Sequence, residues 1–411
     1  MNQLHKRVVV TGLGILSPIG NTVQDAWSSC INGESGITTV DIDLKKCPIS
    51  VGGRLKDFNP EQYLDPKEVR RIDPFIQYGV IAANQSIIDS GILEFTGLDH
   101  SRVGVNFGAG IGGIDTIEKN KILLELKSFK KVSPFFVPGS IINMISGLVS
   151  IKHGFMGPNI SAVTACSTGN HCIGNAARFI SYGDADVMIA GGAEMASTPL
   201  SIAGFLAARA LTKNQDPKTA SRPWDLNRDG FVLSDGAGSL VLEEYDHAKK
   251  RNANIYAEII GFGMSSDAYH MTAPPEDGRG AELCMLNALD DAKINSEDVN
   301  YINAHGTSTL LGDLAETIAL KKVFSSSVPS ISSTKSMTGH TLGAAGAIES
   351  IFSIKSINDG IIPPTINLLM PDPKCNLDYT PIHAVEKNVS IAINNSFGFG
   401  GTNSTLVFQK I

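Results

Sequence analysis

Short apolar segments that end in glycine alternate with helical patterns along this chain, and this alternation restricts its possible folds more than any other feature. The segments are rich in Val and Ile and lie at residues 7–12, 102–108, 185–192 and 299–306. Continuous apolar runs of this length are typical of strands that are buried on both faces. The alternation therefore predicts an α/β protein with buried strands.

One of the intervening helices has clear boundaries in the sequence. Asp73-Pro74 is expected to begin it, because Asp suits the cap and Pro suits the first helical position. Gly91 is expected to follow its last residue, since glycine readily adopts the left-handed conformation that ends many helices. Phe75, Tyr78 and Ile81 would then mark its buried face.

A weak internal similarity indicates a duplicated chain. Residues 183–194 resemble residues 296–308, and residues 235–244 resemble residues 399–409. The length of 411 residues allows two to three domains or one large duplicated unit. We therefore expect two related halves that meet near residues 251–254.

Charge and cysteine content exclude several classes of protein. Lys and Arg total 34 against 41 Asp and Glu, and the net charge of -7 disfavours general attraction to nucleic acid or to a membrane surface. The six cysteines form no Cys-x-x-Cys pair, which argues against a disulfide scaffold and a zinc site. The first residues, MNQLHKRVVVTG, lack a signal-peptide pattern, and no segment has the roughly 20 apolar residues of a membrane span. We expect a cytoplasmic protein.

Residues 108–113, GAGIGG, match the glycine pattern of a dinucleotide-binding turn. They follow an apolar segment and precede a helical pattern at 114–127, as such a site requires. An acidic residue at the end of the next strand is not clearly placed, however, and glycines also permit close packing. We therefore favour a packing role over nucleotide binding.

Cys166 lies where an apolar strand stops and a helix is expected to begin. Residues 167–169 open this helix, which should run to Gly183. The N-terminus of a helix stabilises a thiolate, so the position suits a nucleophile. Free cysteines are also commonly buried in cores, and on these grounds both roles stay open. Cys172, further along the helix, is expected to be a core residue.

Two histidines occupy glycine-rich turns of the kind that often hold catalytic groups. His305 lies in NAHGTST and His340 in STKSMTGH, although each could instead satisfy backbone groups. Lys335 precedes His340 by five residues and is either a solvated cation or a group that tunes nearby charge.

The C-terminal region adds two further candidates. Glu349 could share the polar face of a helix with Ser353 and Ser356. Residues 392–408 predict a hairpin whose glycine-rich turn is either an ordinary turn or a set of backbone N–H groups that bind an oxyanion.

Four motifs, taken in order, resemble those of the beta-ketoacyl-acyl carrier protein synthases. They are TACSTG at 164–169, NAHGTST at 303–309, STKSMTGH at 333–340 and NSFGFGGTN at 395–403. The resemblance extends over essentially the whole chain and includes residues 8–21, 221–238 and 263–275. It implies a thiolase-like α/β fold with two duplicated halves in five αβαβα layers, and it implies a homodimer. Residues 1–251 would carry the nucleophile and residues 252–411 the two histidines.

The resemblance implies an elongating synthase of type II fatty acid biosynthesis. Acyl- and malonyl-loaded acyl carrier protein would condense to 3-oxoacyl-carrier protein with loss of carbon dioxide, without a redox or metal cofactor. Cys166 would be acylated, His305 and His340 would serve decarboxylation, and Lys335 would support the electrostatics of His340. Backbone N–H groups of Cys166 and Phe399 would form the oxyanion hole. Glu349 corresponds to a buried carboxylate with a structural or ion-associated role.

The motifs also separate this chain from several relatives. In the family pattern, degradative thiolases have Cys, His and Cys at the three catalytic positions, and initiating synthases have Cys, His and Asn. In this chain the third position is His340. Chain-length-factor partners lack the nucleophile, which Cys166 retains. A type I elongating synthase or polyketide ketosynthase, a non-catalytic partner subunit and a cysteine-dependent thioester hydrolase remain as alternatives.

The same resemblance assigns substrate contacts. Thr307 and Thr309 would bind the pantetheine arm, Ile111 would line the acyl pocket near the dimer interface, and Phe399 would gate that pocket. A second mobile loop would contain Asp267, His270 and Thr272. The carrier protein of this family is strongly acidic, so docking requires a focused basic patch. The matching positions are Lys67, Arg70, Arg71, Lys130, Lys131 and Arg209.

Overall fold

Within residues 5–41, 49–325 and 327–411, which the computed structural model describes, a ten-stranded mixed sheet runs through the molecule. Its strand order is β10-β9-β13-β14-β8-β1-β7-β6-β4-β5. The N-terminal half supplies β1 (Val8–Leu16), β4 (Val103–Gly108), β5 (Asn159–Ile160), β6 (Val187–Glu194) and β7 (Gly236–Glu244). The C-terminal half supplies β8 (Ala257–Ser266), β9 (Tyr301–Asn303), β10 (Ser330–Ser332), β13 (Ile391–Gly398) and β14 (Thr402–Gln409).

The two halves repeat one topology. In each half, the third, second, fourth, fifth and first strands in chain order lie side by side, giving β5-β4-β6-β7-β1 and β10-β9-β13-β14-β8. The first three strands of each set pair in parallel, and the last two pair antiparallel. A short antiparallel ladder, Val8–Val10 against Ala257–Ile259, joins the sets. The duplicated organisation expected from the sequence is therefore present.

One of the two similarities on which that expectation rested pairs the wrong strands. Residues 235–244 and 399–409 form β7 and β14, which occupy the same place in their halves. Residues 183–194 contain β6, whereas residues 296–308 contain β9, and these strands occupy different places. The topological counterpart of β6 is β13. A strand followed by a glycine turn is a local pattern, and it does not specify the neighbours of the strand in the sheet.

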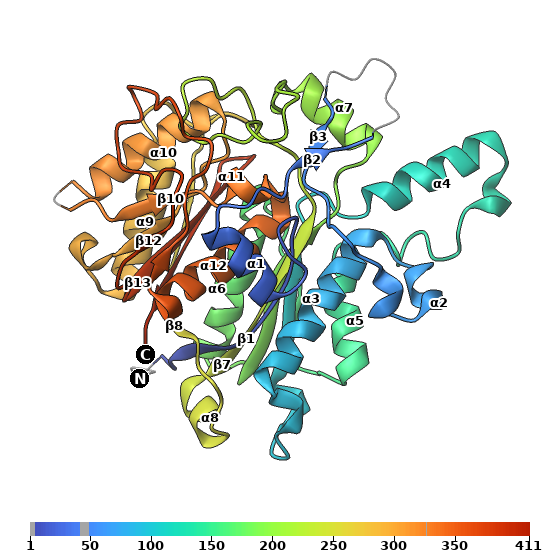
Figure 1. Cartoon of the computed structure of the whole chain (residues 1–411). Coiled ribbons are helices and arrows are strands. Elements are labelled where there is room, and N and C mark those ends of the chain that lie inside the picture. The colour runs from blue at the N-terminus through green and yellow to red at the C-terminus, as the bar shows by residue number, and fades with distance from the viewer. Residues whose placement is uncertain (1–4, 42–48, 326) are drawn as a thin grey trace.

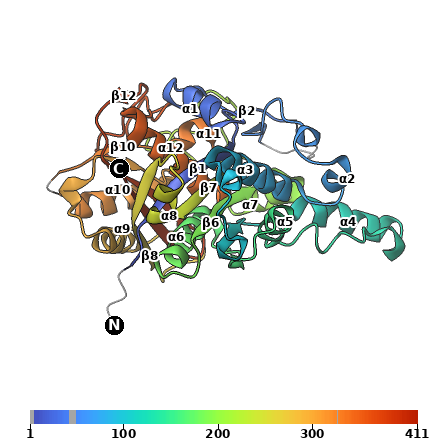
Figure 2. The ribbon, with the colours of Figure 1, turned by 90° about the horizontal axis from the view of Figure 1, so that it is seen from below.

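The helices and the two strand sets of the sheet form five layers, with helices on both outer sides and between the strand sets (Figures 1 and 2). The outer helices α3 (Pro74–Ser90) and α5 (Met144–His153) pack on the N-terminal strands, and α9 (Arg279–Ala292) with α10 (Leu310–Val323) covers the C-terminal strands. The helices α6 (Thr168–Ser181) and α12 (Ala345–Asp359) contact strands of both halves and form the central layer. The expected αβαβα arrangement is confirmed.

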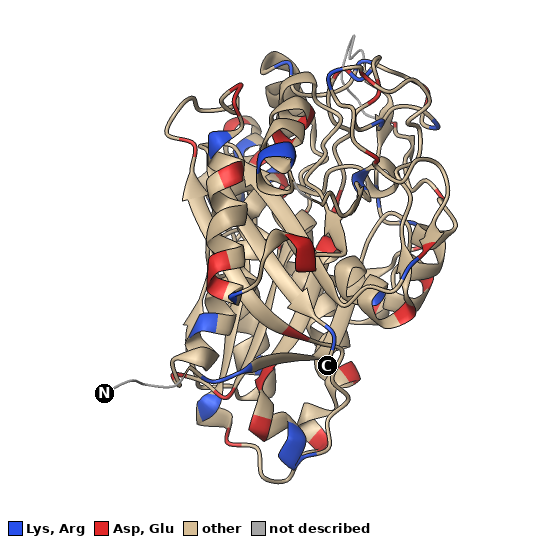
Figure 3. Cartoon of the chain, turned by 90° about the vertical axis from the view of Figure 1, so that its left-hand side faces the viewer, with Lys and Arg blue, Asp and Glu red and all other residues tan. Residues whose placement is uncertain are grey.

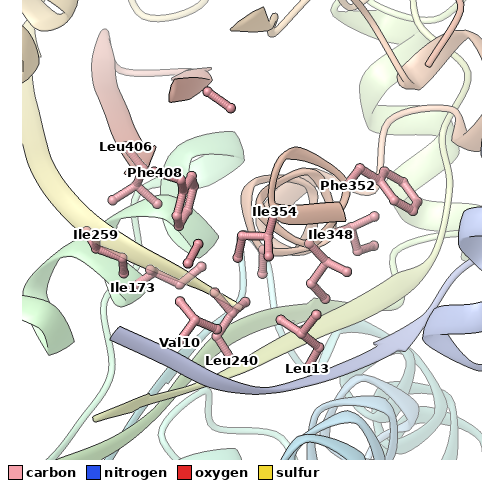
Figure 4. Packing of buried hydrophobic residues seen from close by; sticks show 14 of the residues in the cluster. Val10, Leu13, Ile173, Leu240, Ile259, Ile348, Phe352, Ile354, Leu406 and Phe408 are labelled. Atoms are coloured by element: carbon pink, nitrogen blue, oxygen red, sulfur yellow. The ribbon is translucent and has the colours of Figure 1, made fainter. Parts of the chain in front are cut away.

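The central layer is the main hydrophobic core. In Figure 4, Ile348 and Ile354 of α12 lie over Val10 of β1 and Leu240 of β7. Side chains of the other half close the same cluster, including Ile259, Leu406 and Phe408. Because α12 is covered on both sides, nearly all of its residues are buried. This packing holds the two halves, and the segments that follow their strands, in one fixed arrangement.

Local sequence signals locate helix α3 as predicted. The Asp73 carboxylate accepts a hydrogen bond from the backbone N–H of Phe75, Pro74 is the first helical residue, and Gly91 has a φ of 62°. Phe75 and Ile81 are buried, while Tyr78 is half-buried. The helix therefore begins and ends where the sequence places its cap and its terminal glycine.

The helix α4 (Ile114–Leu126) extends away from the layers as an arm (Figures 1 and 2). A short 3-10 helix, η4 (Phe129–Lys131), follows it. The remaining elements are α1 (Val23–Ile31), α2 (Pro66–Val69), α7 (Pro199–Ala207), α8 (Tyr245–Lys250), α11 (Lys335–Thr338), β2 (Thr38–Thr39), β3 (Val51–Gly52), β11 (Ile361–Ile362), β12 (Val385–Glu386) and the 3-10 helices η1 (Pro60–Gln62), η2 (Ile92–Glu94), η3 (His100–Arg102), η5 (Ala165–Ser167), η6 (Ser296–Asp298) and η7 (Leu342–Ala344).

Cysteine chemistry and membrane character can be stated for the described part of the chain. Cys30, Cys166, Cys172, Cys284 and Cys375 are free and buried. Cys47 and the first four residues lie outside the described residues. Across those same described ranges, no helix is both long and apolar enough to cross a membrane.

Candidate active site

A cavity of about 620 Å³ opens where segments of the two halves meet. Cys166 comes from the N-terminal half, whereas His305, His340 and Phe399 come from the C-terminal half, and all four line the cavity. The structure therefore brings together the groups that the sequence motifs singled out. Cys166 precedes α6, His305 and Phe399 follow β9 and β13, and His340 lies between α11 and η7.

Cys166 lies in a strained turn at the start of α6. The preceding residue, Ala165, has a φ of 50°, a left-handed conformation that costs a non-glycine residue about 1–2 kcal/mol. The hydroxyl of Ser167 donates to the carbonyl oxygens of Ser396 at 3.0 Å and Thr402 at 2.6 Å. These bonds hold the turn against the C-terminal hairpin, and Cys166 has the expected place at a helix N-terminus.

Burial opposes ionisation of the Cys166 thiol. It raises the pKa of Cys166 to about 12, although the positive charge of Lys335 and the backbone N–H groups of Phe399 and Cys166 lower it. The sequence-based expectation that the helix N-terminus favours the thiolate is therefore overridden by desolvation. The two backbone N–H groups that interact with the sulfur are those predicted to form an oxyanion hole.

Two neutral imidazoles lie in the cavity, and one of them contacts this thiol. Nε2 of His340 lies 3.0 Å from Sγ of Cys166. The rings of His305 and His340 are nearly perpendicular, with centroids 5.4 Å apart. Burial, assisted by the charge of Lys335, lowers the pKa of both histidines well below the usual value. Both rings are therefore uncharged near physiological pH and can donate one ring N–H each.

The backbone around each histidine is fixed by a separate contact. Glu316 of α10 accepts hydrogen bonds from the backbone N–H groups of His305 at 2.9 Å and Gly306 at 2.8 Å. The backbone N–H of His340 donates to the carbonyl of Val232 at 2.8 Å. Sequence reasoning missed Glu316. The available signal was a glutamate at helical spacing from apolar residues of the predicted core, at a position where a charged residue is seldom buried without a partner.

Lys335 and Glu349 form a buried ion pair behind the histidines. Lys335 Nζ and Glu349 Oε1 are 2.5 Å apart, and the side chains are 1% and 2% exposed. The solvated-cation interpretation of Lys335 is wrong, and Glu349 is the buried carboxylate that the family resemblance implied rather than part of a solvated helix face. Ser353 and Ser356 are buried as well, and their hydroxyls donate to carbonyls one turn earlier in α12. The central position of α12 between the strand sets of the two halves explains the difference.

The C-terminal hairpin turn lies at the mouth of the cavity. Its glycines Gly400 and Gly401 have φ values of 83° and 71°, which suit glycine and allow the tight turn after Phe399. The N–H of Gly400 donates to the carbonyl of Met271 at 2.7 Å. The predicted gate and the second predicted mobile loop are therefore joined by a backbone hydrogen bond.

The predicted substrate-contact residues all line the same cavity. The hydroxyls of Thr307 and Thr309 are 3.0 Å apart, and Thr272 is exposed at the mouth together with His270. Ile111 is also exposed to this space. The structure thus groups these residues, while their binding roles stay predictions.

The six predicted docking residues are distributed over three segments, and all are exposed. Lys67, Arg70 and Arg71 lie in or just after α2, and Lys130 and Lys131 lie in η4 beyond the arm. Arg209 follows α7 and lines the cavity. The structure therefore places Arg209, alone among these six residues, in the cavity wall.

A second buried carboxylate, Glu194, was also missed by sequence reasoning. It ends β6 and accepts backbone hydrogen bonds from Gly110, Ile111 and Gly112 of the GAGIGG turn. Burial raises the pKa of Glu194 to about 7, whereas these backbone donors lower it. The glycine turn thus surrounds a carboxylate of the chain itself. The packing role favoured for this turn agrees with that arrangement.

Among the residues that the structure describes, no three or more His, Cys, Asp or Glu side chains are arranged to hold a metal ion.

Two family models match the chain. Residues 5–248 match the N-terminal domain of beta-ketoacyl synthases, and residues 256–369 match the C-terminal domain. The chain belongs to the beta-ketoacyl synthase family. The resemblance drawn from the four sequence motifs is therefore confirmed.

Full-length relatives support the same conclusion. The chain is 54% identical to the 3-oxoacyl-[acyl-carrier-protein] synthase 2 of Vibrio harveyi and to that of Coxiella burnetii, with 99% of each chain covered. A relative of the same name from Staphylococcus aureus is 49% identical over 409 residues. These relatives confirm the expected activity class, an elongating condensing enzyme and acyltransferase of fatty acid biosynthesis.

Solved structures of this family have the same fold. A beta-ketoacyl synthase from Burkholderia phymatum is 34% identical with a TM-score of 0.91, and the match covers 99% of this chain and 100% of that one. A type II polyketide ketosynthase, solved with its acyl carrier protein and bound to the hexaketide, gives the same identity, coverage and TM-score. The thiolase-like fold class is thus confirmed.

Proposed function

We propose that this synthase lengthens acyl chains by condensing acyl- and malonyl-loaded acyl carrier protein through an acyl-Cys166 intermediate. The observation that carries the proposal is the 3.0 Å contact between His340 Nε2 and Cys166 Sγ in a cavity that also contains His305. A nucleophile with two adjacent hydrogen-bond donors suits thioester chemistry.

Acyl transfer to Cys166 is the first half of the reaction. The sulfur attacks the thioester carbonyl, and backbone N–H groups of Cys166 and Phe399 stabilise the oxyanion. The tetrahedral intermediate then expels the carrier-protein sulfur, which leaves as a thiol after taking up the proton lost by Cys166. One thioester is exchanged for another, so no external reductant or oxidant is required.

Decarboxylation and carbon–carbon bond formation make the second half. His305 and His340 donate from Nε2 to the thioester oxygen of the malonyl group and stabilise the enolate that forms as carbon dioxide leaves. The neutral state of both imidazoles suits this role. The enolate carbon attacks the acyl-Cys166 carbonyl, the Cys166 sulfur departs as a thiolate and takes up a proton from solvent, and the 3-oxoacyl product is two carbons longer.

Fatty acid elongation is favoured over a polyketide pathway because of the relatives. Identity to the fatty acid enzymes reaches 54%, against 34% for the polyketide ketosynthase. A non-catalytic partner subunit is disfavoured because Cys166 is present and faces His340.

The exposed arm supports a homodimer. Leu126 and Phe129 are 79% and 73% exposed, and Ile122 and Val137 are exposed beside them. Several large apolar side chains exposed on one arm are typical of a protein interface. We therefore place the arm of one copy against a second copy.

Carrier-protein docking would use the basic residues near the arm and cavity mouth. Lys67, Arg70 and Arg71 belong to one exposed segment beside the arm, where the Arg71 guanidinium lies 4.6 Å from the Phe135 ring centre. On the face that carries α9 and α10, Lys and Arg are interspersed with Asp and Glu (Figure 3). The first segment also mixes charges, since Asp65 and Glu68 are exposed beside Lys67. We assign docking to it because the family resemblance places the basic patch there.

We also propose a cellular location for the enzyme and a division of the chain into two halves. We place the enzyme in the cytoplasm, because the five described cysteines are free and such thiols suit a reducing compartment. We also divide the chain into residues 1–251 and 252–411. The matched family domains end at residue 248 and begin at residue 256, on either side of that boundary.

Intact-mass analysis tests the proposed reaction. Wild type, Cys166→Ala and Cys172→Ala are incubated with acyl-carrier protein and then with malonyl-carrier protein. Cys172 is a matched control, since it is a buried cysteine of α6, the helix that follows Cys166. We expect wild type and Cys172→Ala to become acylated and then to release a 3-oxoacyl product two carbons longer, whereas Cys166→Ala stays unmodified.

Other outcomes contradict the proposal in distinct ways. Release of free acid without carbon dioxide would indicate a thioester hydrolase. Repeated condensation to a poly-β-keto chain would indicate a polyketide ketosynthase. Absence of acylation in folded wild type would indicate a partner subunit.

A further inference from the structure

The glycine turn at residues 110–112 is built around the carboxylate of Glu194. Its backbone N–H groups donate to this carboxylate, with distances of 2.6 Å from Gly110, 3.1 Å from Ile111 and 3.0 Å from Gly112. Consecutive N–H groups in such a turn form an anion-binding concavity. The sequence pattern that resembles a phosphate cradle therefore holds an internal anion instead.

A fourth donor comes from a distant segment of the other half. The N–H of Gly343 donates to Oε2 of Glu194 at 3.1 Å. Gly343 is three residues beyond His340 in the chain and belongs to η7. Glu194 is thus the common acceptor for the 110–112 turn and for the segment that carries His340.

Close approach makes this joint rigid. A Cβ atom at Gly343 would lie 2.3 Å from the backbone nitrogen of Gly110 and 2.9 Å from Oε2 of Glu194. A Cβ atom at Gly110 would lie 2.7 Å from the same oxygen. Both positions therefore require glycine, and neither segment can shift without displacing the carboxylate or breaking charge-assisted hydrogen bonds.

Glu194 is placed to act through its neighbours. Its side chain is 0% exposed, whereas Gly110, Ile111, His340 and Leu342 line the cavity. Ile111 and Leu342 present apolar side chains to the space beside Cys166. A change at Glu194 would therefore reach the substrate through the position of these two side chains and through His340.

We propose that Glu194 is a positioning residue that fixes Ile111 and the His340 segment relative to each other and thereby determines the acyl-chain preference of the enzyme. The proposal rests on the condensing reaction proposed above. Ile111 forms part of the cavity wall, so displacement of its backbone changes the length and width available to an acyl chain. Displacement of Gly343 changes the approach of His340 to the same reaction centre.

Glu194→Gln tests this role at nearly constant side-chain volume. The amide nitrogen cannot accept a hydrogen bond, so at least one N–H of the turn or of Gly343 loses its partner. We expect the ratio of acylation rates for octanoyl- and myristoyl-carrier protein to change by about three- to tenfold. Malonyl decarboxylation by the acyl-free enzyme should slow as well, because His340 shares the anchor.

Glu243→Gln is the matched control. Glu243 is also a fully buried glutamate. Glu194 pairs with the first residue of β7, whereas Glu243 lies near the other end of that strand and pairs with Val187 at the start of β6. We expect this variant to lose stability because Glu243 binds Arg251 and His247, yet to retain the wild-type ratio of acylation rates. A shift of equal size in both variants would overturn the proposal, since it would indicate a general effect of destabilisation.

A second comparison separates positioning by way of Ile111 from any other effect. In an Ile111→Ala background, Glu194→Gln should change the octanoyl-to-myristoyl ratio much less than in wild type, because the side chain through which it acts is gone. Equal effects in both backgrounds would overturn the proposal. If Glu194→Gln fails to fold, Glu194→Asp, which keeps the charge but is shorter by one methylene, is measured in the same two backgrounds.

The proposed function and this inference fail separately. Absence of acyl-enzyme in wild type contradicts the condensing reaction. A normal wild-type cycle with an unchanged chain-length ratio in folded Glu194→Gln contradicts only the role of Glu194.

Discussion

Nζ of Lys335 and Oε1 of Glu349 lie 2.5 Å apart in the protein interior, with side chains only 1% and 2% exposed. The pair connects α11 to the central helix α12 and places a positive charge near the two histidines and Cys166. Removing one member of such a buried pair leaves the other charge without a partner in the protein interior, which is more costly than keeping both. The pair therefore couples stability to the electrostatics of the site.

Removing one member of this pair should be costly. We expect Lys335→Met or Glu349→Leu alone to lower the free energy of unfolding by about 3–5 kcal/mol, because each leaves an uncompensated buried group. The double variant should recover much of that loss without recovering condensation, since the charge beside the histidines stays absent. Urea denaturation and a condensation assay measure the two effects. Equal stability losses in the single and double variants would contradict a mutual role.

The lowered pKa values of His305 and His340 predict a specific pH dependence of stability. Unfolded histidines titrate near pH 6.5, whereas burial keeps the folded ones neutral to well below that value. Below about pH 6.5 the unfolded chain binds more protons, so stability falls with decreasing pH, by up to about 1.4 kcal/mol per pH unit for each histidine. Denaturant titrations at a series of pH values should show that the free energy of unfolding falls less steeply with decreasing pH in His340→Asn than in wild type.

The lowered pKa values also predict the acid limb of the pH–rate profile, that is, where the rate of decarboxylation falls at acid pH. Malonyl decarboxylation should persist below pH 6.5, because both imidazoles stay neutral there. In Lys335→Met the limb should move to higher pH, since the Lys335 charge contributes to lowering both values. A pH–rate profile of carbon dioxide release measures this. An unmoved limb in Lys335→Met would assign the lowering to burial alone.

Phe399→Ala tests the proposed gate without removing the proposed oxyanion donor. The substitution keeps the backbone N–H but deletes the ring at the cavity mouth. We expect several-fold faster acylation and weaker discrimination between chain lengths, because the closed position loses its barrier. Acylation rates for a series of acyl-carrier proteins measure both properties. Unchanged rates with unchanged discrimination would leave Phe399 without a gating role.

Charge reversal tests the docking segment. Lys67→Glu with Arg70→Glu should raise KM for acyl-carrier protein by about tenfold and flatten its dependence on salt, while turnover of an acyl-pantetheine thioester stays unchanged. Lys250→Glu is the control, because Lys250 is an exposed lysine on α8, which lies at the bottom of Figure 1, away from α2 at the right. Equal effects of the two reversals would indicate a response to net charge rather than a docking site.

Two substitutions on the arm test the homodimer. Leu126→Glu with Phe129→Glu places charges on side chains that are 79% and 73% exposed in one chain. Folding of the chain should survive, whereas an interface that buries these residues should dissociate. Sedimentation analysis should therefore show a dimer for wild type and a monomer for the variant. A dimer that persists in the variant would move the interface away from the arm.

Local signals allowed much of the fold to be predicted. The caps at Asp73 and Gly91 and the start of a helix at Cys166 depend on residues adjacent in the chain, and the structure has them where expected. The equivalence suggested for residues 183–194 and 296–308 failed because strand pairing, rather than local composition, gives β6 its place. Local chemistry therefore predicted elements better than it predicted their neighbours.

The sequence by itself determined the order of the motifs, the family and the identity of Cys166, His305 and His340 as the groups to examine. Only the tertiary structure decided that Glu194 binds a turn and a segment of the other half, and that Lys335 and Glu349 are a buried pair. The physical reason is separation along the chain. These contacts form when the two repeated halves pack around α6 and α12. The residues next to each partner in the chain do not indicate which distant residue it will contact.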